Sequence, residues 1–252
     1  MELALLLCFA FLAGFIDAVV GGGGLVQLPA FFLAYPSLPV PVILGSNKFA
    51  ALAGTSVAVT RYLRSTPVPW KAVLPAICTA LVFSVIGAQL VSLFDKELMK
   101  PLVLALLIAV ALYTFLKKDL GLRKTASLDQ RTLFLCSLAT GLLLGLYDGF
   151  FGPGTGSFLI LVYVSVFGFD FLNASVSAKL VNCATNVAAL AYFMYTDQIR
   201  YDLALPVAAC NMAGSWLGAR MAVKKGSKFI RVLFLVVVTG MILKFAYDLL
   251  FA

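Results

Sequence analysis

Gly21-Gly22-Gly23-Gly24 interrupts an apolar run that extends from Leu3 to Tyr35. Glycine has no Cβ and adopts backbone conformations that other residues take only at a cost. In a run long enough to span a membrane, such a break predicts unwound backbone at bilayer depth. Lipid cannot satisfy that backbone, so it must pack against protein or line a wet cavity. The sequence therefore predicts a first helix in two pieces, residues 3–20 and 25–35.

A near-copy of this break, Gly152-Pro153-Gly154-Thr155-Gly156, lies 131 residues further along. Each break follows a similar frame, Gly14-Phe15-Ile16-Asp17 in one case and Gly145-Leu146-Tyr147-Asp148 in the other. The same offset matches Ser46 and Lys48 with Ser177 and Lys179, Pro75 with Pro206, and Ser84, Gly87 and Ala88 with Ser215, Gly218 and Ala219. Chance does not readily match Asp, Lys and Pro in one register, so the sequence predicts an internal duplication.

The composition indicates a polytopic, all-α membrane protein. Hydrophobic residues make up 62% of the 252 residues and charged residues 12%, whereas a soluble domain is typically about 25% charged. At about 20 residues per spanning helix, the chain has room for roughly eight spanning segments, or ten pieces with the short broken halves. The N-terminal 20 residues lack a basic start, so we interpret them as a retained helix and not a signal peptide.

Further helices are predicted at 42–63, 70–93 and 102–116, with a polar turn at 95–100. The predicted organisation is a first membrane repeat at 1–116, a cytoplasmic linker at 117–130 and a second membrane repeat at 131–252.

Loop charges predict that the two repeats have inverted topology. Residues 61–71 carry three positive charges and no negative one, while the matching loop, 192–202, contains two aspartates and one arginine. Residues 220–231 carry five positive charges, while the matching 89–100 balances two lysines against Asp95 and Glu97. By the positive-inside rule, the basic loops are cytoplasmic and both termini lie outside. Whether the broken first helices span or are re-entrant stays open, because residues 25–35 are too short to span alone.

Lys48 and Lys179 lie inside helices predicted to cross the bilayer. An ionised lysine at that depth costs at least about 2.5 kcal/mol, so each needs an anionic partner. That partner is either a substrate or a carboxylate, with Asp17 paired to Lys48 and Asp148 paired to Lys179. Lys179, Asn182 and Asn186 share one helical face, and Ala51 and Thr55 take the two asparagine positions in the first half. This face either lines the site or bonds neighbouring helices.

The helices that begin after the breaks have N-terminal amides without internal partners, and their dipoles favour negative charge. With the two lysines nearby, the sequence predicts an electropositive centre that binds a small anion. The candidate binding residues therefore include Gly23, Gly24, Gly154, Thr155 and Gly156. Asp17 and Asp148 are candidates to cap these amides, pair with the lysines or carry a coupled proton.

Several chemistries are disfavoured by composition. The chain contains no histidine, which excludes His-based metal sites, haem ligation through His and a Ser-His-Asp triad. We expect no metal, no cofactor and no enzymatic activity. The expected partners are a small anion and the lipid bilayer, with no nucleic acid and with homo-oligomerisation left open. The alternatives to an anion carrier are a cation or proton antiporter that uses Asp17 and Asp148, and a non-transporting scaffold.

The two glycine frames, together with Ser46-Asn47-Lys48 and Ser177-Ala178-Lys179-xx-Asn182-xxx-Asn186, resemble the sulfite exporter TauE/SafE family of bacterial permeases. The resemblance covers essentially the whole chain. It implies an inner-membrane transporter of sulfur-containing anions such as sulfite, sulfoacetate or related organosulfonates, without cofactors. The predicted substrate-binding set is completed by Asn47 and Thr55.

Overall fold

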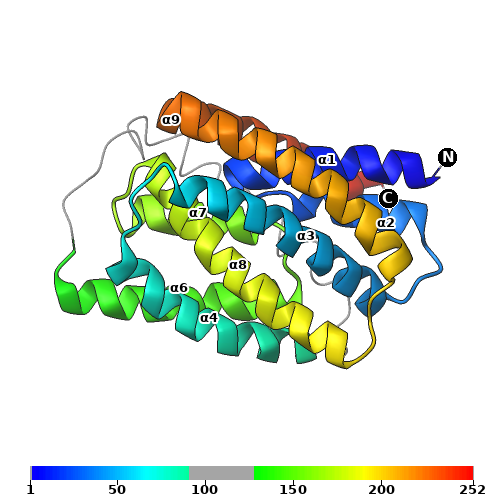
Figure 1. The fold of residues 1–252 in the computed structure, drawn as a ribbon, viewed down its shortest axis with the longest axis horizontal. Coiled ribbons are helices and arrows are strands. Elements are labelled where there is room, and N and C mark those ends of the chain that lie inside the picture. Colours follow the sequence, from blue (N-terminus) through cyan, green and yellow to red (C-terminus); the bar gives the residue numbers. More distant parts are fainter. Residues whose placement is uncertain (1, 91–127, 252) are drawn as a thin grey trace.

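The computed structural model describes residues 2–90 and 128–251 and is helical, with no strand in those ranges (Figure 1). The helices are α1 (Glu2–Val20), α2 (Gly24–Ala34), α3 (Val40–Leu63), α4 (Trp70–Leu90), α6 (Gln130–Phe150), α7 (Thr155–Ser165), α8 (Phe171–Tyr195) and α9 (Tyr201–Phe251). Of these, α1, α3, α4 and α6 are long and apolar enough to cross a membrane. The predicted turn at 95–100, the predicted helix at 102–116 and most of the predicted linker lie outside the described residues.

The helix bounds repeat at the offset found in the sequence. Adding 131 to the bounds of α2 gives 155–165, which are the bounds of α7. The same addition turns 40–63 into 171–194, within one residue of α8. Figure 1 shows that α1 and α6 run in opposite directions, as do α3 and α8.

Both predicted helix breaks are present. Gly21, Gly152 and Gly154 have φ values of 78°, 87° and 84°, a left-handed region that side chains with a Cβ disfavour. The helical direction changes at these residues, so α1 and α6 end and the short helices α2 and α7 begin.

The two halves are interleaved. Gly14 of α1 packs on the backbone of Asn211 in α9, and Gly145 of α6 packs in the same way on Ala80 in α4. These contacts are equivalent, since 14 + 131 = 145 and 80 + 131 = 211. Small residues allow such close helix approach. The broken helix of each half therefore lies against a helix of the other half.

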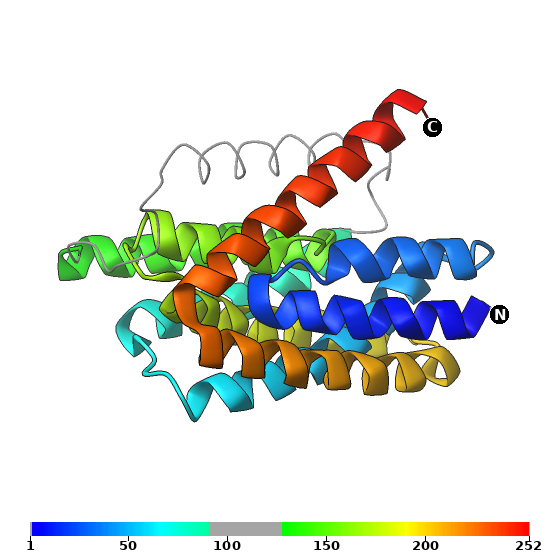
Figure 2. The same ribbon diagram turned by 90° about the horizontal axis from the view of Figure 1, so that it is seen from above.

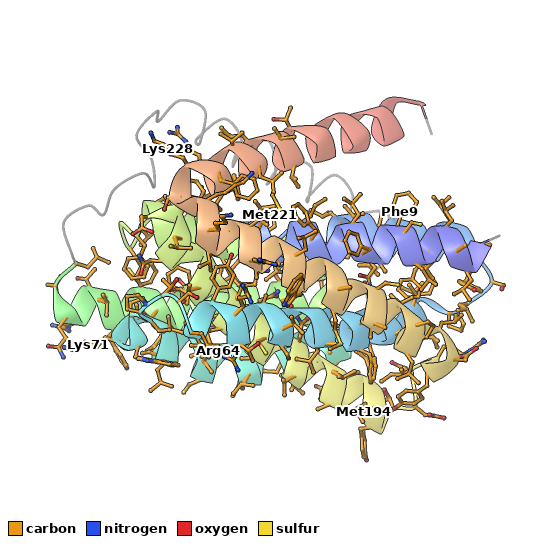
Figure 3. All side chains as sticks on the ribbon, turned by 45° about the horizontal axis from the view of Figure 1, so that its top comes forward. Phe9, Arg64, Lys71, Met194, Met221 and Lys228 are labelled. Atoms are coloured by element: carbon orange, nitrogen blue, oxygen red, sulfur yellow. The ribbon has the colours of Figure 1, made fainter. Side chains whose placement is uncertain are left out.

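The pair α3 and α8 lies between the α1–α9 pair and the α4–α6 pair (Figures 1 and 2). Helix α9 bends at Gly226, where φ is 70° and ψ is −166°. Figure 3 shows Lys71 and Lys228 toward one end of the bundle and Met194 toward the other. Near the basic loops at 61–71 and 220–231, the guanidinium groups of Arg61 and Arg220 lie 5.7 and 5.4 Å from the centroid of the Trp216 ring.

Aspartates cap two helices of the second half. The Asp129 carboxylate accepts the N–H groups of Arg131 and Thr132, both at 3.1 Å. Hydrogen bonding from the Thr132 side chain and backbone holds the pKa of this exposed carboxyl below its usual value. Asp170 caps α8 through the Asn173 N–H at 2.9 Å and also accepts the Ser227 hydroxyl of α9 at 3.3 Å.

The Asp170 cap gives a first prediction. Replacing Asp170 with alanine is expected to lower the free energy of unfolding by about 1 kcal/mol, the usual value of an aspartate N-cap. Thermal unfolding of the detergent-solubilised protein measures the change. Thr60→Ala is the control, because the exposed Thr60 hydroxyl bonds only to Val57 of its own helix. Equal stability of the two variants would contradict the prediction.

Candidate functional site

Lys48 projects from α3 into the protein interior and is 5% exposed. Its Nζ lies 2.6 Å from Asp148 Oδ2 at the end of α6 and 3.1 Å from Asn186 Oδ1 on α8. Asp148 is 2% exposed. The ammonium group is therefore held by one carboxylate and one amide oxygen, both from the second half.

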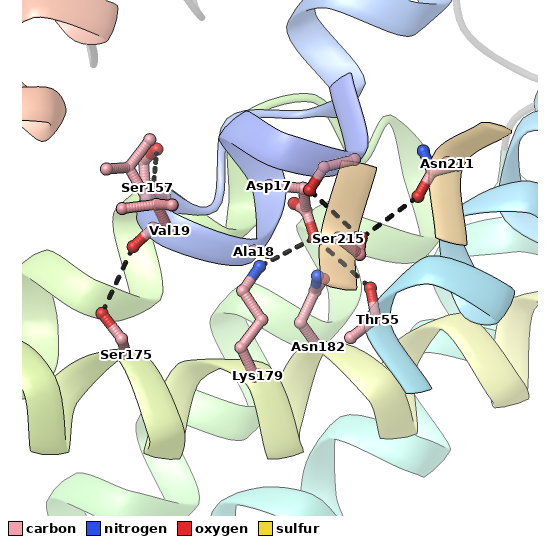
Figure 4. Close-up of polar contacts among 12 residues, drawn as sticks. Asp17, Ala18, Val19, Thr55, Ser157, Ser175, Lys179, Asn182, Asn211 and Ser215 are labelled. Carbon is pink, nitrogen blue, oxygen red and sulfur yellow. Dashed lines mark hydrogen bonds and ion pairs between the residues drawn. The ribbon is translucent and has the colours of Figure 1, made fainter. Parts of the chain in front are cut away.

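Lys179 projects from α8 and is fully buried. Its Nζ lies 2.8 Å from Asp17 Oδ2, near the end of α1 (Figure 4). The Thr55 hydroxyl of α3 donates to the same carboxylate oxygen at 3.3 Å. This second cluster is the counterpart of the first, because Lys48, Asp17 and Thr55 correspond to Lys179, Asp148 and Asn186 at the offset of 131.

The ion pairs join the two halves, and the predicted pairing within each half is wrong. Lys48 is paired with Asp148, not Asp17, and Lys179 is paired with Asp17, not Asp148. The reason is the interleaving of the halves, which carries the end of each broken helix to the lysine-bearing helix of the other half. When all four groups are ionised, the charges of the two lysines and the two aspartates sum to zero. The carboxylates therefore neutralise the predicted electropositive centre.

The two glycine breaks touch each other. A Cβ added to Gly156 would lie 2.5 Å from Gly21 Cα. The Gly21 carbonyl accepts the Ser157 N–H at 3.2 Å, and the Val20 carbonyl accepts the Ser157 hydroxyl at 2.8 Å. The Ser157 amide, at the N-terminus of α7 where an anion was predicted to bind, is thus hydrogen-bonded to the opposite break.

The other predicted glycines line the ion pairs or the junction of the breaks. Gly23 packs on the Asp17 side chain, while Gly24 packs on Pro153 and Gly154 on Leu25. Gly152, which was not in the predicted set, lies beside the Lys48 ammonium, since a Cβ there would be 3.2 Å from Nζ.

The remaining predicted residues divide between different roles. The Thr155 hydroxyl donates to the Gly152 carbonyl at 2.8 Å and so bonds its own turn. Asn47 is 6% exposed, and its amide oxygen has no hydrogen-bond partner among the described residues. Asn182 lies beside Lys179 and Thr55 (Figure 4), whereas Asn186 bonds Lys48. The two asparagines of one helical face therefore lie beside different lysines (Figure 4).

Two buried amides, Asn211 and Gln27, were missed from the sequence, and Ser215, which the sequence only matched with Ser84, lies beside them. Asn211 Nδ2 donates to Gln27 Oε1 at 2.6 Å. The Ser215 hydroxyl donates to the Gly14 carbonyl at 3.1 Å and lies 3.5 Å from Asn211 Oδ1. The available signal was an isolated amide within an apolar stretch, at positions whose counterparts are Phe158 and Ala80. Within 2–90 and 128–251, no cluster of three or more Cys, Asp or Glu could hold a metal ion.

Comparisons with known proteins show which family the chain belongs to. The family model described as sulfite exporter TauE/SafE matches residues 6–245. The chain is 35% identical to a "Probable membrane transporter protein ORF9" of Sinorhizobium sp. over 98% of this chain and 93% of the relative. It is 34% identical to a "Probable membrane transporter protein" of Haemophilus influenzae, over 98% and 95%. It is 32% identical to "Probable membrane transporter protein YfcA" of Escherichia coli K12, over 98% and 90%.

No solved structure matches the chain. The family match covers nearly all of the sequence, both described halves of the fold included. Together with the apolar helices, it identifies a multi-pass membrane protein. The chain belongs to the sulfite exporter TauE/SafE family.

Proposed function

We propose that the protein is an alternating-access carrier for a small sulfur-containing anion, such as sulfite or an organosulfonate, in the bacterial inner membrane. The observation that carries the proposal is the pair of buried ammonium groups, Lys48 and Lys179, each held beside a glycine break by an aspartate of the other half. Buried ionisable residues at bilayer depth mark substrate and ion pathways. Discontinuous helices in paired halves mark a transporter's binding site.

The ion pairs suggest how an anion would bind. Each ammonium has three N–H donors, so an anionic oxygen can bind the lysine beside Asp17 or Asp148 or draw it away from that carboxylate. A carboxylate that loses its partner in a low-dielectric site is destabilised as an anion. It would then take up a proton or a cation, so anion binding and proton or cation uptake would be linked.

We further propose inverted-topology repeats with both termini outside. Support comes from the repeated helix bounds, from the opposite directions of α1 and α6, and from the basic residues at one end of the bundle. Rocking of one repeat against the other would expose the central site to each side in turn.

A second candidate is a cation or proton antiporter that uses Asp17 and Asp148 without any anion. The zero net charge of the four ionised groups favours this candidate, because the site has no uncompensated positive charge. Asp148→Asn would then abolish a flux driven by a pH gradient that sulfite does not compete with. Under the anion-carrier proposal, the same flux requires the anion.

The test is sulfite uptake into proteoliposomes. Wild-type protein is expected to give saturable uptake above that of protein-free liposomes. The double variant Lys179→Ala/Asp17→Ala, which removes the ion pair as a unit, is expected to lower the rate at least tenfold. Lys71→Ala is the control, since it removes an exposed charge at the helix end and should transport normally. Normal uptake by the double variant, or no uptake of sulfite or sulfoacetate by the wild type, would refute the proposal.

A further inference from the structure

We propose that the two ion pairs are functionally unequal. In this proposal, only the region around the Asp17–Lys179 pair binds the oxygen atoms of the anion, through Gln27, Asn211 and Asn182 as well as Lys179. This inference rests on the proposed function and assigns the substrate contacts of that site. It predicts one anion per chain, although the fold holds two equivalent lysines.

Gln27 carries an unused hydrogen-bond donor inside the protein. The residue lies on α2 and is 1% exposed. Its Oε1 accepts from Asn211, whereas its Nε2 is buried without a hydrogen-bond partner among the described residues. Buried polar atoms in native proteins are almost always satisfied, so this unsatisfied donor calls for an explanation, such as a ligand that accepts its hydrogen bond.

The polar groups around Gln27 extend toward the ion pair (Figure 4). Asn211 Oδ1 lies against Gly54, where any Cβ would overlap it, and the next residue, Thr55, donates to Asp17. Figure 4 shows Asn211, Ser215, Asn182 and Thr55 around Asp17 and Lys179. These side chains come from α1, α3, α8 and α9, with Gln27 added from α2.

The region around the Asp148–Lys48 pair lacks these amides at the equivalent positions. At the offset of 131, Gln27 corresponds to Phe158, Asn211 to Ala80 and Asn182 to Ala51. The helix contacts are nonetheless the same, because Gly145 packs on Ala80 as Gly14 packs on Asn211. The fold therefore packs this interface without the amides. Their presence near one ion pair, without equivalents near the other, indicates a role other than holding the helices together.

The chemistry around the Asp17–Lys179 pair suits an anion with several oxygens. The ammonium of Lys179 supplies the charge, and the amides of Gln27, Asn211 and Asn182 each carry N–H groups that can donate to an anion. A sulfite or sulfonate group presents three oxygens that each accept hydrogen bonds, and hydrogen bonds to a charged acceptor are the stronger kind. At the other ion pair, the amide that contacts Lys48 is that of Asn186, and its oxygen faces the ammonium.

The test compares sulfite binding by wild type and the double variant Gln27→Leu/Asn211→Ala. The double variant removes both partners of the 2.6 Å bond, so it leaves neither amide of that pair buried and unpaired. We expect its melting temperature without anion to stay close to that of the wild type, and its Kd for sulfite to rise at least tenfold. Titration calorimetry of the wild type should give one sulfite per chain. Asn211→Ala alone, which copies Ala80, is the second variant if the first fails to fold.

Phe158→Leu is the matched control at the counterpart of Gln27, and its Kd should stay within twofold of wild type. Wild-type affinity in both amide variants, or two sulfite ions per chain, would overturn the inference while leaving the carrier proposal standing. A loss of melting temperature without anion in Asn211→Ala, with unchanged affinity, would show that the amides are structural. No sulfite or sulfoacetate binding by the wild type would refute the carrier proposal itself, and the inference with it.

Discussion

Replacing Lys179 with alanine is expected to lower the free energy of unfolding by about 3–5 kcal/mol, the usual cost of breaking a buried ion pair from one side. Lys179 is fully buried and its Nζ lies 2.8 Å from an Asp17 carboxylate that is only 15% exposed. Without the ammonium, Asp17 keeps the hydrogen bond from the Thr55 hydroxyl at 3.3 Å. A neutral donor at that distance cannot replace a counter-ion. Thermal and denaturant-induced unfolding in detergent measure the loss.

The partner of Lys179 is identified by comparing two double variants. Lys179→Ala/Asp17→Ala should recover most of the lost stability, because it removes the buried charge that the single substitution leaves unpaired. Lys179→Ala/Asp148→Ala is the matched control, and it should be less stable than Lys179→Ala because it also leaves Lys48 without its carboxylate. Recovery by Asp148→Ala in place of Asp17→Ala would show that the lysines pair within each half.

That comparison separates what the sequence could predict from what it could not. The helix breaks, the helix bounds and the duplication were predictable, because Gly21 to Gly24, the prolines and the matched Asp and Lys residues are local signals. The partner of each lysine was not, because Lys48 has an equivalent aspartate in each half and the choice depends on which helices pack together. Interleaving of the halves is a tertiary property, and it also brings the opposing carboxylates that neutralise the centre.

The missed amides illustrate the same limit. Gln27 and Asn211 are 184 positions apart and meet only because α2 and α9 converge near α1. A search for equivalent residues in the two halves passes over them, since their counterparts are Phe158 and Ala80. The duplication revealed the shared framework of the site, whereas the asymmetry carries the chemistry proposed above. Asymmetric positions are therefore the first to test in a duplicated carrier.

Substituting alanine at the junction of the two breaks is expected to have a similarly large effect. Gly21 combines a φ of 78° with a position whose Cβ would overlap the Gly156 backbone. Left-handed strain and overpacking together are expected to cost about 2–5 kcal/mol. Gly156→Ala meets the same contact from α7 without the φ penalty, because its Cβ would lie 2.5 Å from Gly21 Cα. Unfolding in detergent measures the stability of each variant, and sulfite flux measures its function.

Two controls separate strain from overlap. Gly226 has a φ of 70° and a ψ of −166°, a region almost restricted to glycine, with nothing within 4 Å of an added Cβ, so Gly226→Ala carries the strain alone, about 1–3 kcal/mol. Gly240 has neither, so Gly240→Ala should be neutral or slightly stabilising. Because Gly21 and Gly156 meet at one contact, the double variant should cost less than the sum of the single ones. Additive costs would mean that the breaks do not touch. A non-additive result would show that the two breaks are in contact, which makes their junction one of the places where the two halves are coupled.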